Sequence, residues 1–343
     1  MAWRVQFAGP ARDRLQHSAE LAQLILEVSF RRLWKGPKKQ GWSWFVELAT
    51  ELLKRQVQTA LDNTDVKRAR RYLDSMAVRS SALKRVNIAP VVHEKLQGSW
   101  FCDNRSPGDI TLLYLHGGGY SFYPRSYASF IALITLAAKA RTFALDYRLT
   151  PEHRFPAQLE DALQAYCWLL TRSIEPGDLV IAGDSAGGHL VLSLLLKLRE
   201  LGLPQPALAI ALSPPTDFEM ETVGDEDSDW ISGAALLQWR DWFCGPEQHR
   251  NPLVSPLLAD LRNLPPIYIQ AGCSEILFES IQAFADRAGS QGADIALESW
   301  QNMNHVFQLF GQDAPQSSEA LRRIGEVVDL RVRTARERRT VAC

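Results

Sequence analysis

Asp178-Leu179-Val180-Ile181-Ala182-Gly183-Asp184-Ser185-Ala186-Gly187-Gly188-His189 is the stretch that decides the expected fold. Its first part, residues 179–182, is a short apolar run typical of a buried parallel strand. Residues 189–203 then carry apolar side chains at helical spacing. Between the two, Gly183 and Gly187 flank Ser185 in the pattern G-x-S-x-G. The stretch therefore predicts a strand, a tight turn and a helix, with a serine at the turn.

Crowding explains why glycines flank such a serine. At the apex of a sharp strand-to-helix turn the serine backbone is strained, and side chains two positions away would collide with the neighbouring strand and helix. The turn projects the hydroxyl out of the sheet at a helix N-terminus, whose amides favour developing negative charge. Ser185 is therefore a candidate nucleophile. A plain glycine-rich strand–helix turn is the alternative from this stretch alone.

Strands and helices alternate on both sides of this turn. We expect strands at 86–92, 99–103, 109–116, 142–146, 207–212, 267–271 and 295–300, and helices at 126–140, 156–171 and from 317 to about 330. Such alternation places parallel strands in one sheet covered on both faces. The expected fold class is therefore α/β, with a mostly parallel central sheet.

The N-terminal quarter of the chain has a different pattern. Residues 1–85 contain no convincing strand, and helical periodicity over 15–34, 44–60 and 65–77 predicts an N-terminal helical cap segment. The core is then expected in two parts, residues 86–215 and 251–343. Between them, residues 216–250 are a predicted cap insertion with a helix at 232–244, over the carboxyl ends of the strands. The basic tail, 331–339, is expected to be a frayed and solvated end.

Basic and aromatic residues gather between the first two predicted helices. The cations are Arg31, Arg32, Lys35, Lys38 and Lys39, and the aromatic residues are Trp34, Trp42 and Trp44. One interpretation is an amphipathic element for a membrane surface, as in a lipase. The other is a cap whose aromatic residues pack on the main domain. Because these residues cluster at a loop and are not sorted onto two helix faces, the pattern favours the cap.

Composition and charge narrow the function classes. The 343 residues have a net charge of −1, which gives no argument for nucleic-acid binding. No apolar run has the pattern of a signal peptide or the length of a membrane span, so we expect no stable membrane insertion. The five cysteines are widely spread without a C-x-x-C pair, which favours reduced thiols in a cytoplasmic protein. We expect no metal or organic cofactor, and a homodimer is left open.

A serine hydroxyl is a poor nucleophile without a base, an orienting acid and donors for the oxyanion. The donors are expected from Gly117, Gly118 and Gly119, which follow a predicted strand and leave their amides uncovered, and from the amide of Ala186. A phosphate-binding loop is the competing interpretation. Neither G-x-x-x-x-G-K-[ST] nor G-x-G-x-x-G occurs in the chain, which disfavours it.

The base and the acid are sought after later strands, because the order along the chain in this arrangement is serine, acid, histidine. His305 follows the strand at 295–300 and is the candidate base. Glu275 follows the strand at 267–271 and is the candidate acid, where it would hold the histidine tautomer and stabilise the imidazolium. Glu279, one turn further on, is the alternative acid, although its position favours a helix-surface charge.

Several segments, taken in order, resemble the hormone-sensitive-lipase-like family of α/β hydrolases, in the bacterial carboxylesterase branch. They are His116-Gly117-Gly118-Gly119-Tyr120, Asp146-Tyr147-Arg148-Leu149-Thr150-Pro151-Glu152-His153, Phe155-Pro156-Ala157 with Glu160-Asp161-Ala162, Gly183-Asp184-Ser185-Ala186-Gly187-Gly188, Leu212-Ser213-Pro214 and Asn304-His305-Val306-Phe307. They run from about residue 110 to 310. The G-D-S-A-G form indicates the subgroup.

The resemblance implies an α/β-hydrolase fold with a helical cap. It implies Ser185 as nucleophile, His305 as base, and the amides of Gly118, Gly119 and Ala186 as the oxyanion hole, with Gly117 bending the loop. It implies a non-catalytic scaffold that holds the glycine loop by ion pairs, made of Asp146, Arg148, Glu152, Glu160 and Asp161. The family most often has aspartate where this chain has Glu275.

The function expected from these residues is hydrolysis of short- to medium-chain acyl esters through an acyl-enzyme intermediate. A lactonase or an acyltransferase could use the same three side chains. A ligand receptor on the same fold is the alternative from another class, as in the plant gibberellin receptors that resemble this family. Those receptors have lost the catalytic histidine, whereas His305 is present here in its motif.

Overall fold

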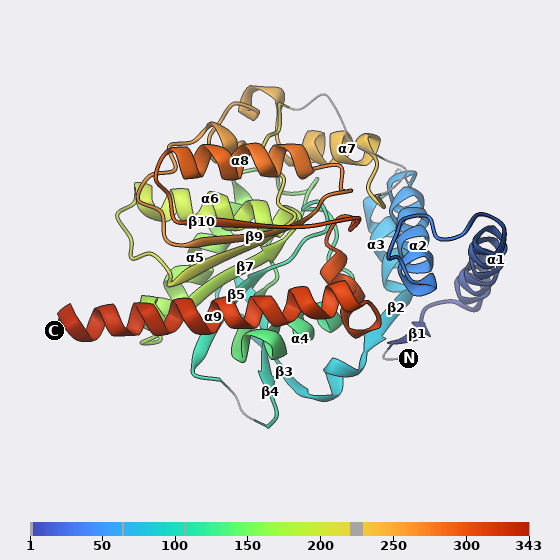
Figure 1. Cartoon of the computed structure of the whole chain (residues 1–343), viewed down its shortest axis with the longest axis horizontal. Helices are drawn as coiled ribbons and strands as arrows, with labels where there is room; N and C mark the ends of the chain where they lie inside the picture. The colour runs from blue at the N-terminus through green and yellow to red at the C-terminus, as the bar shows by residue number, and fades with distance from the viewer. Residues whose placement is uncertain (1–2, 64, 106–107, 220–228, 343) are drawn as a thin grey trace.

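The computed structural model describes residues 3–63, 65–105, 108–219 and 229–342. Its centre is an eight-stranded sheet (Figure 1) in the order β10-β9-β8-β7-β5-β6-β4-β3. The strands are β3 (Val86–His93), β4 (Leu96–Asp103), β5 (Ile110–Leu115), β6 (Ala140–Leu145), β7 (Leu179–Asp184), β8 (Leu208–Leu212), β9 (Ile267–Gly272) and β10 (Ile295–Trp300). Neighbours from β10 to β6 are parallel, and β4 and β3 continue antiparallel at one edge. The predicted fold class is confirmed.

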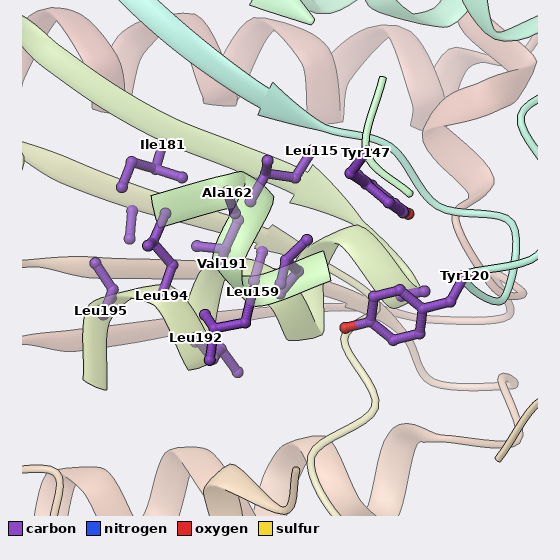
Figure 2. Close-up of a cluster of buried hydrophobic side chains, with 14 of the residues drawn as sticks. Leu115, Tyr120, Tyr147, Leu159, Ala162, Ile181, Val191, Leu192, Leu194 and Leu195 are labelled. Carbon is purple, nitrogen blue, oxygen red and sulfur yellow. The ribbon is translucent and has the colours of Figure 1, made fainter. Parts of the chain in front are cut away.

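Helices cover both faces of the sheet. One face carries α5 (Ala157–Thr171), α6 (Ala186–Glu200) and α8 (Phe278–Ser290), and the other carries α4 (Tyr127–Ala138) and α9 (Pro315–Ala342). Along β5, Leu113 and Leu115 face the first set of helices, and Leu112 and Tyr114 face the second. Strands buried on both faces need apolar residues at every position, which is why these segments read as continuous apolar runs. Figure 2 shows part of the first layer, where α5 and α6 pack against the sheet.

The N-terminal segment contains the three predicted helices, α1 (Ala11–Lys35), α2 (Trp44–Leu61) and α3 (Val66–Asp74). The expectation that it holds no strand is wrong. β1 (Trp3–Phe7) pairs antiparallel with β2 (Met76–Ser80), so the two ends of the segment are joined. The third helix also ends early, because the chain enters β2 at Met76. Strands of five residues carry too little periodicity to be read from sequence against a helical background.

The predicted insertion contains one helix, α7 (Gly233–Phe243), where Ser232 accepts the Ala235 N–H as its N-cap. Residues 220–228 of this insertion lie outside the described residues. Short 3-10 turns complete the chain at Ser81–Lys84, Pro176–Asp178, Pro246–Gln248, Pro256–Leu258 and Phe307–Asp313. Among the described residues, none of the helices combines the length and the apolar character that crossing a membrane requires.

The basic tail is not a frayed end, which corrects the expectation from sequence. α9 continues through it to Ala342, and Arg336 forms ion pairs with Asp178 and Asp109, which lie at the starts of β7 and β5. Arg331 pairs with Asp294. The acidic partners of these arginines lie far away in sequence. The run of arginines by itself therefore does not predict that it forms ion pairs.

Candidate active site

Ser185 stands at the turn between β7 and α6, with φ +51° and ψ −123°. A positive φ is unfavourable for a residue with a Cβ and marks local strain. The flanking glycines are required by contact. A Cβ on Gly187 would lie 2.0 Å from the Leu115 carbonyl oxygen, and one on Gly183 would lie 2.5 Å from the Gly187 backbone. The crowding expected from the sequence is therefore present, and Ser185 is 9% exposed.

The glycine loop follows β5, beside Ser185. Gly118 and Gly119 have φ of +92° and +59°, so the loop bends at these two residues. Gly117 has no positive φ, and its N–H donates to Asp184 Oδ1 at 3.1 Å. The expectation that Gly117 bends the loop is therefore wrong. A side chain at Gly117 would instead collide with Asp184, at 2.3 Å.

Asp184 connects the loop to the turn. Besides the Gly117 amide, its carboxylate accepts the Tyr114 hydroxyl at 2.6 Å and the Tyr127 hydroxyl at 2.9 Å. The side chain is fully buried, and burial raises the pKa of Asp184 to about 6, although these three donors act in the opposite direction. Asp184 thus fixes the glycine loop relative to Ser185.

His305 and Glu275 lie together after β10 and β9. His305 Nδ1 is 3.6 Å from Glu275 Oε2, and both side chains are fully buried. This separation is in the range of an ion pair and longer than a hydrogen bond. Among the described residues, neither ring nitrogen of His305 and neither carboxylate oxygen of Glu275 has a hydrogen-bond partner. Glu279 is exposed on α8.

Backbone contacts bring His305 toward Ser185, although the two residues are far apart in sequence. The Ser185 N–H donates to the Leu212 carbonyl at 2.7 Å, and the next residue, Ser213, accepts the Val306 N–H on its hydroxyl at 3.1 Å. The loop after β8 therefore joins the serine turn to the loop after β10 that carries His305, called here the histidine loop. This role explains a polar residue at position 213, which sequence analysis noted only as part of a motif.

Sequence analysis missed Asp229. This buried carboxylate accepts the His305 N–H at 3.1 Å and the Ile276 N–H at 2.9 Å. It therefore joins the histidine loop to the loop after β9 that carries Glu275. Burial is the largest cause that raises the pKa of Asp229 to about 6, while the nearby His305 lowers it. Asp229 ends an acidic stretch in the sequence, and nothing there separates it from its neighbours.

Other histidines near the site are held in structural contacts. His116 stacks between Tyr123 and Tyr147, with ring centroids 3.7 and 4.0 Å away, and burial lowers its pKa to about 3. His189 contacts the Tyr120 hydroxyl and the Val254 carbonyl, and burial lowers its pKa to about 4. Of these three histidines, His305 is the one whose ring nitrogens are uncommitted.

Two cavities meet at Ser185 and Gly119. The first, of about 70 Å³, lies under α7 and is lined mainly by apolar side chains that include Phe218, Leu236 and Leu277. The second, of about 170 Å³, extends toward α2. Its lining also includes Gly118 and Trp230, whose ring lies 5.3 Å from that of His305. Trp239 of α7 lines both cavities, so it stands between them.

The N-terminal helices contact the histidine loop. Asn304 donates to the Thr50 hydroxyl of α2 at 2.7 Å, and the Trp42 indole donates to the Asn302 carbonyl. Trp42 is buried, whereas Trp34 is 76% exposed. The predicted packing of cap aromatic residues on the main domain therefore holds for Trp42 and does not hold for Trp34.

Four of the charged residues expected to form a scaffold, Arg148, Glu152, Glu160 and Asp161, are paired. Arg148 contacts Asp161 at 2.8 Å and Glu160 at 2.9 Å. Glu152 pairs with Arg70 of α3, which also donates to the carbonyls of Ser121 and Thr150. The cap thus holds the segment after the glycine loop, a contact that motif matching did not indicate. Among the described residues, no group of three or more His, Cys, Asp and Glu side chains could hold a metal ion.

The fold and this arrangement define the class: an α/β hydrolase with a serine at the strand-to-helix turn. The chain matches the alpha/beta hydrolase fold family over residues 112–309, and it belongs to that family. It is 36% identical over 230 residues to an acetyl-hydrolase of Streptomyces hygroscopicus, which covers 66% of this chain and 76% of that protein.

Solved structures place it more narrowly. An esterase of the bacterial hormone-sensitive lipase family matches with TM-score 0.71 and 31% identity, over 92% of this chain and 98% of that one. EstE5, in a crystal soaked with p-nitrophenyl butyrate, matches with TM-score 0.77 and 30% identity, over 85% and 99%. The predicted resemblance is confirmed, and the chain is a carboxylic-ester hydrolase of the hormone-sensitive-lipase-like group.

Proposed function

We propose that this chain hydrolyses short- to medium-chain acyl esters through an acyl-enzyme on Ser185. The observation that carries the proposal is the position of Ser185. Its hydroxyl-bearing side chain stands on a strained turn, in the wall shared by two cavities, and Gly119 of the glycine loop lines the same two cavities. A plain glycine-rich turn between a strand and a helix would not need this arrangement.

In the first step, Ser185 Oγ attacks the carbonyl carbon of the ester while His305 accepts the hydroxyl proton. The negative charge that forms on the carbonyl oxygen is stabilised by the amides of Gly118, Gly119 and Ala186. The intermediate collapses, the ester C–O bond breaks, and His305 gives the proton to the leaving alcohol. Water then attacks the acyl-enzyme with His305 again as the base, which releases the acid and restores Ser185.

Glu275 orients His305 in this proposal and stabilises the imidazolium that forms. The 3.6 Å between His305 Nδ1 and Glu275 Oε2 shortens when substrate is bound, because catalytic hydrogen bonds are often long in the free enzyme. Asp229 holds the backbone of both loops and is a positioning residue. The N–H groups that donate to Asp229 are on the main chain, so it does not compete with Glu275 for the ring.

The sizes of the two cavities support short to medium chains. Trp239 separates them. Its side chain is buried and packs against Gly119, since a Cβ on Gly119 would lie 2.4 Å from the indole. An acyl chain longer than one cavity would have to displace this ring. We therefore expect Trp239→Ala to join the cavities and to move the preferred acyl chain toward longer esters. The matched control is Trp242→Ala, on the same helix, because Trp242 lines neither cavity.

The test of the function is hydrolysis of p-nitrophenyl esters from acetate to palmitate. Wild type should be most active on the shorter chains, and Ser185→Ala should lose about 10³-fold or more in kcat/KM. Ser193→Ala, which removes a buried hydroxyl about two turns further along α6, should keep most of the activity. A folded wild type without activity at any chain length would contradict the proposal.

Lactonase and acyltransferase activities use the same three side chains. A lactonase differs in its substrate, a cyclic ester, and an acyltransferase differs in the acceptor, an alcohol in place of water. Hydrolysis of a lactone ring, or ester formation when a second alcohol is added, would identify them in the same assay. The cytoplasmic location and a homodimer stay predictions. The cap roles proposed for residues 1–85 and 216–250 rest on the contacts of α2 and α7 with the two cavities.

A further inference from the structure

α1 presents an apolar stripe that faces away from the rest of the chain. Figure 1 shows α1 at the edge of the molecule, with α2 and α3 between it and the sheet. Its inner side buries Leu24 and Val28. Its outer side exposes residues at three- and four-residue spacing from one end of the helix to the other: Leu15, Ala19, Ala22, Leu26, Phe30, Leu33 and Trp34.

The exposure of the largest of these side chains is unusual for a surface helix. Leu26 is 70% exposed, Phe30 65%, Leu33 85% and Trp34 76%. Single exposed apolar residues need no explanation, but a continuous exposed stripe marks an interaction site. None of these residues lines the cavities at Ser185, so catalysis does not explain them.

The charge of the segment indicates what the stripe meets. Residues 1–85 hold 17 Lys and Arg against 8 Asp and Glu, a net charge of +9, whereas the whole chain carries −1. The remaining 258 residues therefore carry −10. A near-neutral chain with such a division has one strongly basic end, and the apolar stripe lies on that end.

Cations also lie next to the most exposed part of the stripe. Arg31, Arg32, Lys35 and Lys38 surround the C-terminal end of α1, where the aromatic residues are. Buried Glu47 forms ion pairs with both arginines, and Glu51 forms one with Lys38. These four cations therefore meet only two carboxylates in the ion pairs described here. At the other end of the helix, Arg14 is exposed beside Leu15.

We propose that the outer face of α1 docks on an anionic lipid surface, with the apolar stripe in the interface and the basic segment against the headgroups. A helix that lies in the membrane plane has this composition, with aromatic and aliphatic residues on one face and cations beside them. Lipid headgroups of negative charge attract such a segment, and the attraction is weakened by salt.

A second copy of this chain fits the stripe less well. Pairing of two α1 helices in parallel would bring the two basic C-terminal ends together. Antiparallel pairing would bring Arg14 of one copy against the basic end of the other, and either arrangement would bring two segments of net charge +9 into contact. Like charges at a shared interface oppose association.

The experiment is flotation of the full chain with vesicles, which needs no catalytic activity and is therefore independent of the proposed function. Vesicles of equal parts phosphatidylcholine and phosphatidylglycerol should carry wild type, and phosphatidylcholine alone should carry much less. Phe30→Glu with Leu33→Glu should lower the bound fraction about tenfold or more, because it places charges in the apolar interface. High salt should also release the protein.

The matched control is Val92→Glu with Leu201→Glu, which adds the same charges at exposed apolar positions far from α1, 76% and 49% exposed. It should bind as wild type does, and thermal unfolding of both variants verifies that they fold. Absence of flotation by folded wild type, or equal flotation of all three proteins, overturns the proposal. So does a wild-type dimer in light scattering that Phe30→Glu with Leu33→Glu dissociates, without vesicle binding.

Discussion

The serine turn and α1, the first helix of the N-terminal cap, differ in how closely they are packed. From Ala186 to Leu196 every residue of α6 is buried, and a Cβ on Gly183 or Gly187 would collide with the backbone of Leu115 in β5. In α1, by contrast, His17, Leu24 and Val28 are the buried residues among those described, and most of the helix is exposed. The turn is determined by close packing, whereas α1 has few buried residues to hold it.

This difference teaches where the fold tolerates change. A close-packed segment has one arrangement, because any added atom must displace backbone. A helix with few buried residues can loosen without loss of the core. Polar contacts from the cap reach the site through Thr50, Trp42 and Arg70, which touch the histidine loop and the segment after the glycine loop.

The largest effect is expected at the acid, where the packed core meets the chemistry. Glu275→Gln should lower kcat by about 10²- to 10⁴-fold, because the amide removes the charge that stabilises the imidazolium. Glu279→Gln, on the exposed side of α8, is the control and should change kcat less than twofold, within the range usual for surface substitutions. Steady-state kinetics on p-nitrophenyl butyrate gives both values. Equal losses in the two variants would contradict the assignment of Glu275.

The packing of the turn itself is tested by one methyl group. Gly187→Ala should lower the free energy of unfolding by about 3 kcal/mol or more, since the Cβ would lie 2.0 Å from the Leu115 carbonyl oxygen. Gly289→Ala in α8 has no atom within 4 Å of the new Cβ and should be neutral or stabilising. Urea unfolding measures both. A stable Gly187→Ala protein would show that the turn is less constrained than the packing indicates.

The buried Asp184 predicts an unusual dependence of stability on pH. Its pKa is raised from 3.8 to about 6 in the folded protein, so the folded state holds this proton more tightly than the unfolded state does. The contribution of Asp184 to stability is therefore greatest below about pH 4 and falls as the pH rises through 6.

Asp184→Asn removes this titration with little change in shape. As the pH rises from 4 to 6.5, the free energy of unfolding of wild type should fall by roughly 2–3 kcal/mol relative to that of the variant. Urea unfolding across this pH range measures the difference, in which all other groups cancel. Parallel curves for the two proteins would mean that Asp184 does not titrate there.

The smallest effect is expected where the cap touches the site. Thr50→Val removes the acceptor of buried Asn304 and should lower the free energy of unfolding by about 1–2 kcal/mol, with a fall in kcat of less than tenfold. Ser43→Ala removes the N-cap of α2 at a similar cost of about 1 kcal/mol and leaves Asn304 in place. If both variants lose the same kcat, the contact stabilises the cap and does not position the histidine loop.

The sequence by itself determined the core and the local part of the site. Apolar runs predicted the strands of the parallel sheet, and the glycines around Ser185 predicted the turn, because both depend on neighbours in the chain or on residue size alone. His305 and Glu275 were predicted as base and acid from their order after successive strands, because in a parallel sheet the strand ends meet at one edge.

Only the tertiary structure decided the contacts between distant segments. Asp229 joining two loops, Arg70 holding the segment after the glycine loop, the β1–β2 pair and the ion pairs of the C-terminal helix all depend on partners that no local pattern specifies. The exposure of the α1 stripe belongs to the same class. An amphipathic pattern indicates that a helix has an apolar face, but the packing of the other helices determines whether anything covers it.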